Sequence, residues 1–169
     1  MGWRRRNSRQ ETAGRGATGF AICARIAGFH SCLRAMTEAA ASPSTPFEWI
    51  GGEVRVQALV DRFYDLMDLE PAYAELRASH GSTLDDARQK LFWFLCGWLG
   101  GPDHYQSRFG HPRLRMRHMP FSIGILERDQ WVACMDQAMG ETGVPADLRA
   151  RLKESFMGTA DWMRNRGAP

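Results

Sequence analysis

The chain has 169 residues, of which 44% are hydrophobic, and its formal net charge is +3. This length and composition suit one compact domain with a sizeable core and a tail. No apolar run approaches the roughly 18 residues of a membrane-spanning helix, so we expect a soluble protein without a membrane partner. The charge is uneven: residues 1–36 hold seven arginines and one acidic residue, a charge of +6, which leaves −3 for the remainder.

Residues 1–46 are expected to be a disordered extension and linker. The stretch 39–46 consists of Ala, Ser, Thr and Pro, a composition typical of linkers. The basic arm lacks the interleaved aromatic side chains that stack on bases, so we expect no nucleic-acid partner. A secretory signal and a transit peptide are alternatives for this Arg-rich start, although Arg25 interrupts its apolar run. We favour Met36 as the natural first residue, with a domain that covers 47–165.

The first predicted helix covers residues 53–68. Apolar side chains recur three and four positions apart in this range, as on one face of an amphipathic helix. They are Val56, Leu59, Val60, Phe63, Tyr64 and Met67. A short helix is predicted from Pro71 to about Ser79, and residues 80–81 form a turn.

The central predicted helix begins after Ser82 and Thr83. A hydroxyl side chain followed three residues later by an acidic one is typical of a helix start. The stretch Gly100–Pro102 ends this helix, since glycine leaves helical backbone angles at low cost and proline cannot continue a helix. Its apolar face contains Leu84, Ala87, Leu91, Phe94, Leu95 and Trp98.

The rest of the domain is also predicted to be helical. Residues 103–112 read as a loop with one turn, and a short helix covers 113–118. Two longer helices follow, one over 125–141 and one behind Pro145. No segment alternates with the period of two that a half-buried strand requires, so the predicted fold class is all-α.

The four cysteines are scattered and include no C-x-x-C pair, so they do not indicate a disulfide framework or a zinc site. Cys96 and Cys134 lie in apolar helical patterns, where a free cysteine usually acts as a small buried hydrophobic residue. Reduced thiols are typical of a cytoplasmic protein.

Among the histidines, His118 has the setting that a haem ligand needs. A haem requires a neutral imidazole that points at the iron from an apolar wall, with the ring held through its other nitrogen. His118 ends the predicted short helix between Met116 and Met119, whereas His104 and His111 lie in polar loop. On the residues alone a structural histidine is the commoner case, so both interpretations stay open.

Four other side chains also admit two interpretations. Tyr64 and Trp131 are either core residues whose polar atoms bond a neighbour or donors to a diatomic ligand on iron. Arg115 and Arg117 precede His118. They form either a solvated face or a pair that binds haem propionates, because guanidinium groups match carboxylate geometry.

Three stretches of the chain closely resemble the group II truncated haemoglobins. They are GGPDHY at 100–105, GHPRLRMRHMPF at 110–121 and ERDQWVACM at 127–135. Several specific residues at fixed offsets within 36 positions make agreement by chance improbable. The resemblance covers roughly 47–165 and leaves the tail unmatched.

This resemblance implies a two-over-two helical sandwich around one haem b. The family's proximal iron ligand corresponds to His118, and its distal tyrosine and tryptophan correspond to Tyr64 and Trp131. The position on the central helix that is a histidine in many haemoglobins is Ala87 here. The other residues that the resemblance places around the haem are His80, Leu91, Arg115, Arg117 and Phe121.

The resemblance also implies a ferrous haem protein that binds O₂, NO and CO. Two or three hydrogen-bond donors near the ligand predict slow release, which suits ligand chemistry or sensing better than bulk delivery. A haem-dependent peroxidase or an NO-detoxifying enzyme is the alternative. A haem-free helical interaction module is the third interpretation. An electron donor or reductase is expected as a partner, and a homodimer is left open.

We predict that residues 1–35 are dispensable for folding and haem uptake, because the charge break and the linker composition both precede Phe47. A chain that starts at Met36 should match the full chain in its thermal unfolding midpoint and its Soret absorbance. Failure of the shorter chain to fold or to take up haem would contradict this prediction.

Overall fold

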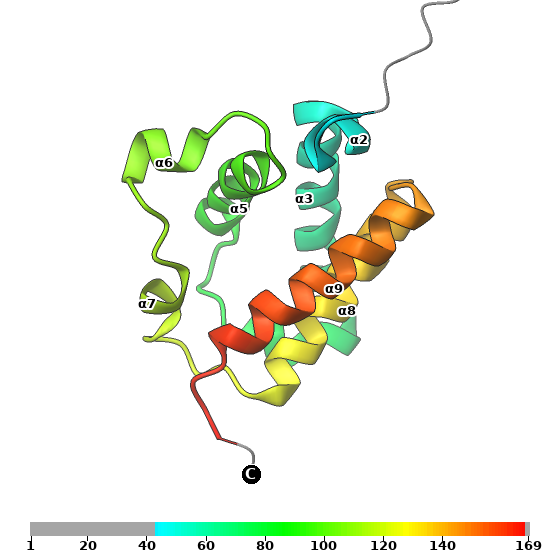
Figure 1. The fold of residues 1–169 in the computed structure, drawn as a ribbon. Helices are drawn as coiled ribbons and strands as arrows, with labels where there is room; N and C mark the ends of the chain where they lie inside the picture. Colours follow the sequence, from blue (N-terminus) through cyan, green and yellow to red (C-terminus); the bar gives the residue numbers. More distant parts are fainter. Residues whose placement is uncertain (1–42, 168–169) are drawn as a thin grey trace, which may run out of the picture. The chain divides into compact units, whose positions relative to one another are not determined.

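The computed structural model describes residues 43–167, and these residues fold into helices with no strand among them (Figure 1). The predicted disordered extension lies outside the described residues as far as position 42. In chain order the elements are α2 (Pro46–Ile50), α3 (Gly52–Leu69), the 3₁₀-helix η1 (Pro71–Tyr73), α4 (Ala74–Ala78), α5 (Asp85–Trp98), α6 (His104–Phe109), α7 (Leu114–His118), α8 (Ile125–Glu141) and α9 (Ala146–Met163).

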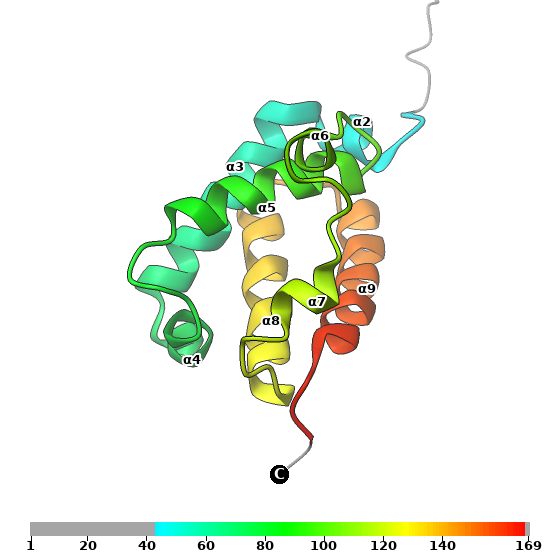
Figure 2. The same cartoon turned by 90° about the vertical axis from the view of Figure 1, so that its left-hand side faces the viewer.

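Two helix pairs form the two layers of the domain. α3 packs against α5, α8 packs against α9, and α3 crosses α8 to join the pairs (Figures 1 and 2). The core lies at this crossing, where the apolar faces of the long helices meet. Its fully buried members include Val56, Leu59, Val60 and Phe63 of α3, Met135 and Met139 of α8, and Leu148 of α9. This arrangement confirms the predicted all-α, two-over-two sandwich.

The start of α5 differs from its prediction. The helix begins at Asp85, its N-cap residue is Leu84, and no side chain caps it. The hydroxyl cap predicted at Ser82 or Thr83 is therefore wrong. The physical reason is tertiary: Leu84 is buried in the core, and Arg77 holds the preceding loop by donating to the carbonyl oxygen of Ser82.

The structure contains two short helices beyond those predicted, one of them where only a single turn was expected in the loop. The loop expected over 103–112 contains α6, whose first turn is capped by the Asp103 carboxylate, which accepts from the backbone N–H of Gln106. At the start of the domain, the Thr45 hydroxyl caps α2 by accepting from the N–H of Glu48. Both helices have only five or six residues, too short for periodicity to reveal.

α2 packs on the end of α5 through a glycine. The backbone N–H of Phe47 donates to the carbonyl oxygen of Leu99 at 2.9 Å. A Cβ atom added at Gly101 would lie 2.5 Å from the Phe47 ring, closer than carbon atoms can approach. The ring therefore rests on the backbone of the glycine turn that ends α5.

Both cysteines in the described range are free and buried, as predicted. Burial raises the pKa of the Cys96 thiol to about 11 and that of Cys134 to about 12. Both thiols are therefore protonated and unreactive at neutral pH. Within residues 43–167, no helix combines the length and the apolar character needed to cross a membrane.

We predict that Gly101→Ala lowers the free energy of unfolding by about 1–3 kcal/mol, because the new methyl group overpacks against the Phe47 ring. Gly158→Ala is the matched control. Nothing lies within 4 Å of a Cβ added at Gly158, which is inside α9, so helix propensity should raise stability by about 0.5–1 kcal/mol. Urea unfolding measures both changes. Equal effects of the two substitutions would show that α2 does not pack on Gly101 in solution.

Candidate haem site

His118 is the last residue of α7, and its half-buried ring is held by the helix that carries it. Nδ1 lies 2.7 Å from the carbonyl oxygen of Leu114, one helical turn earlier. A carbonyl oxygen can only accept, so the proton of the neutral ring is on Nδ1. Nε2 then presents a lone pair away from its own helix. This is the tautomer that a metal-ligating histidine needs.

Large apolar residues close to His118 in the sequence are not buried by the described part of the chain. Met116, Met119 and Phe121 remain 57%, 56% and 48% exposed, and the Phe121 ring centroid lies 6.4 Å from that of His118. A free imidazole nitrogen beside accessible apolar groups fits the proximal face of a haem, which offers an iron atom and a wide apolar macrocycle.

The two arginines of α7 are exposed on the same short helix as His118. Arg115 donates from Nη1 to the carbonyl oxygen of Trp162. Arg117 donates from Nε to the carbonyl oxygen of Pro112 at 3.0 Å, and its guanidinium lies 5.9 Å from the Tyr105 ring centroid. A guanidinium has five N–H donors, so both side chains keep donors for an anion after these contacts.

Tyr64 lies on α3 and Trp131 on α8, and both rings pack against the ring of Phe63. The ring centroid of Phe63 lies 5.0 Å from Tyr64 and 5.4 Å from Trp131. Tyr64 is only 4% exposed, and burial raises the pKa of its hydroxyl well above the usual range. The hydroxyl is therefore a hydrogen-bond donor at neutral pH. No hydrogen bond joins it to another residue in the described range.

His80 lies just beyond α4 and faces Tyr64. Its ring centroid is 6.2 Å from that of Tyr64, in an edge-on arrangement. Nδ1 lies 2.9 Å from the carbonyl oxygen of Leu76, so this ring also keeps Nε2 free. Burial lowers the pKa of His80, although the hydrogen bond to the Leu76 carbonyl oxygen acts in the opposite direction. Burial thus favours the neutral form of the His80 ring.

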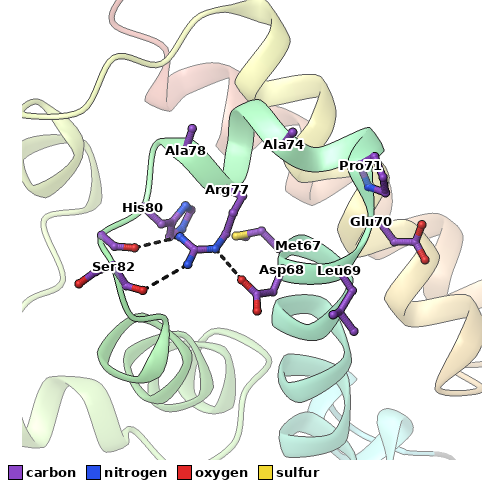
Figure 3. Close-up of a pocket in the computed structure, with 11 residues that line it drawn as sticks. Met67, Asp68, Leu69, Glu70, Pro71, Ala74, Arg77, Ala78, His80 and Ser82 are labelled. Atoms are coloured by element: carbon purple, nitrogen blue, oxygen red, sulfur yellow. Dashed lines mark hydrogen bonds and ion pairs between the residues drawn. The ribbon is translucent and has the colours of Figure 1, made fainter.

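A cavity of about 520 Å³ lies on the surface side of His80, between the end of α3, α4 and the loop that follows (Figure 3). Arg77 crosses it, donating to the Asp68 carboxylate at 2.7 Å and to the carbonyl oxygen of Gly81 at 2.9 Å. His118, Tyr64 and Trp131 are not among its lining residues. This cavity is therefore distinct from the predicted haem site, and His80 is the predicted site residue that lines it.

The remaining predicted site residue is Leu91. Leu91 packs on the core from α5 and is partly buried. Two histidines set aside by the sequence analysis have other partners: Nε2 of His104 lies 2.8 Å from the Glu53 carboxylate, and Nδ1 of His111 accepts from the N–H of Arg113.

Sequence reasoning missed one contact at this site, which is made by Asn165. The side-chain amide of Asn165 donates to the carbonyl oxygen of His118 itself, at 3.1 Å. Asn165 lies beyond the end of α9 in the polar stretch Arg-Asn-Arg. No apolar periodicity or motif marks such a stretch, so the sequence offered no signal for it.

Comparisons with known proteins show the family to which the chain is similar. The model of the family described as "Bacterial-like globin" matches residues 45–165. The Group 2 truncated hemoglobin YjbI of Bacillus subtilis (strain 168) is 38% identical over 122 residues, which cover 72% of this chain and 89% of the relative.

Solved structures agree with this match. The cold-adapted truncated hemoglobin of Pseudoalteromonas haloplanktis TAC125 is 44% identical, with a TM-score of 0.71 over 73% of this chain and 100% of the other. The Group II 2-on-2 hemoglobin of Agrobacterium tumefaciens is 41% identical, with a TM-score of 0.72 over 76% and 99% of the two chains. The chain therefore belongs to the bacterial-like globins, among the group II truncated haemoglobins.

Proposed function

We propose that this globin holds haem b through Nε2 of His118 and binds O₂, with NO and CO as further ligands, and that it releases O₂ slowly. Membership of a globin family implies a haem and a small gas ligand. The observation that carries the finer assignment is the bond from Nδ1 of His118 to the Leu114 carbonyl oxygen at 2.7 Å, because it leaves Nε2 as the free ligating atom.

The residues around His118 suit the rest of the cofactor. Met116, Met119 and Phe121 supply apolar contact area, and Leu91 supplies more from the central helix. Arg115 and Arg117 are the cations nearest in sequence, and each keeps N–H donors for a propionate. When bound, the haem would supply a ferrous iron that can take a diatomic ligand.

The distal residues act as hydrogen-bond donors to that ligand. The Tyr64 hydroxyl acts as a hydrogen-bond donor, because burial keeps it protonated. The indole N–H of Trp131 can act only as a donor. His80 faces Tyr64 and adds a third polar group. Each neutral hydrogen bond contributes about 0.5–1.5 kcal/mol, and about 1.4 kcal/mol corresponds to a tenfold change in an equilibrium constant. Two such donors therefore support slow release of O₂.

We predict that His118→Gly abolishes stable haem retention and that added imidazole restores it. Glycine removes the ligating nitrogen and leaves room for a free imidazole in its place. Absorption spectra of the ferrous protein, with and without imidazole, measure this.

His104→Ala and His111→Ala are the controls, because these side chains bond to the Glu53 carboxylate and to the backbone N–H of Arg113 rather than to His118. They should keep the wild-type spectrum. An unchanged axial-ligand spectrum in His118→Gly without imidazole would refute the assignment of the proximal ligand.

We also predict that Tyr64→Phe and Trp131→Phe each raise the O₂ dissociation rate about threefold to tenfold, as the loss of one hydrogen bond of about 1 kcal/mol requires. The double variant should be non-additive, because both donors serve one ligand. Stopped-flow dissociation of O₂ from the four proteins measures the rates.

Dissociation of CO from the same four proteins is the internal control. Bound CO carries less negative charge than bound O₂, so its rate should change less. Equal effects on both gases, or no effect on O₂, would mean that Tyr64 and Trp131 are packing residues.

A further inference from the structure

α7, the helix that carries His118, gains little stability from its own residues. α7 has five residues, and none of them is buried by other described parts of the chain. Its N-cap residue, Arg113, lies in the left-handed region at φ 45°, and no side chain caps the helix. A single turn of helix is not stable in isolation, since nucleation costs more than one turn of hydrogen bonds returns. Contacts from elsewhere must therefore position His118.

Asn165 supplies such contacts through both the nitrogen and the oxygen of its side-chain amide. Nδ2 donates to the carbonyl oxygen of His118 at 3.1 Å and to that of Phe121 at 2.7 Å. Oδ1 accepts from the backbone N–H of Ile123 at 3.0 Å. The partners are two carbonyl oxygens and one N–H group, so the orientation of the amide follows from their chemistry.

The backbone around Asn165 strengthens this connection. The N–H groups of Asn165 and Arg166 both donate to the carbonyl oxygen of Ile123, at 3.0 and 3.1 Å. Arg166 also donates from Nε to the hydroxyl of Ser122 at 2.9 Å. In Figure 1 the red segment after α9 accordingly runs beside the yellow-green loop between α7 and α8.

We propose that Asn165 is a positioning residue for the proximal ligand: it fixes the backbone at His118 and at Phe121, and so sets how the imidazole approaches the iron. This inference rests on the proposed role of His118. Two constraints then act on His118. The Leu114 carbonyl oxygen fixes the rotation of the ring, and the Asn165 amide fixes the main chain that carries it.

Asn165→Asp tests the two donors. An aspartate keeps the shape and the acceptor toward Ile123, but it turns an anionic oxygen toward two carbonyl oxygens. Asn165→Leu, of similar volume, removes all three bonds without adding charge. Because Asn165 follows the last helix, both variants should keep the helical circular dichroism of the wild type.

Three measurements on the haem-loaded protein report positioning. The iron–histidine stretching band in the resonance Raman spectrum of the ferrous protein should shift or broaden. Haem transfer to an apomyoglobin acceptor should become at least about tenfold faster. Amide hydrogen exchange over 118–123 should accelerate, while exchange in α3 and α8 stays unchanged.

Arg164→Ala is the control within the same segment. It removes the ion pair between Arg164 and Asp161, and this pair does not include a residue of the loop between α7 and α8. An unchanged Raman band and unchanged haem transfer in both Asn165 variants would overturn the proposal, and so would equal changes in Arg164→Ala. If His118→Gly keeps its axial ligation, the proposed function itself fails. If His118→Gly loses ligation while the Asn165 variants behave as wild type, only the positioning role fails.

Discussion

A hydrogen bond of 2.7 Å between Nδ1 of His118 and the carbonyl oxygen of Leu114 decides which ring nitrogen is available for chemistry. A neutral imidazole has two tautomers, and an unheld ring would present either nitrogen to a metal. The carbonyl acceptor selects one tautomer and also limits rotation of the ring. The proposed haem ligation depends on this bond, because Nε2 is a ligand only while Nδ1 carries the proton.

The proposed distal side of the site is held by packing in the core rather than by a single hydrogen bond. Tyr64 and Trp131 are attached to α3 and α8, the two helices that cross in the core, and Phe63 separates their rings. The apolar residues beside Tyr64 on α3, which are Val60, Phe63 and Met67, are fully buried. Close packing of this kind leaves little freedom for a side chain to move. Tyr64 and the partly buried Trp131, which are the proposed distal donors, are therefore held by contacts that also stabilise the fold.

The proposed proximal side lacks such buried packing and is held mainly by hydrogen bonds. α7 contributes no buried residue within the described range, so its place is set by groups that arrive from the end of α9. These contacts join positions 42 to 47 residues apart in the chain. The fold thus combines a tightly packed wall around Tyr64, on the proposed distal side, with a segment around His118, on the proposed proximal side, that is held by a few polar bonds.

The sequence by itself determined the long helices and the family. Apolar periodicity predicted the helices over 53–68 and 125–141 because each buries one face along many turns, and the motifs between 100 and 135 predicted a group II truncated haemoglobin. The start of α5 was decided by a tertiary contact, the burial of Leu84. The helices α2 and α6 are capped locally by Thr45 and Asp103 but are too short for periodicity to reveal. The contact of Asn165 with His118 was likewise visible only in the tertiary structure. Hydrogen bonds between distant backbone and side-chain groups leave no periodic pattern in a sequence, because only the folded chain brings their atoms together.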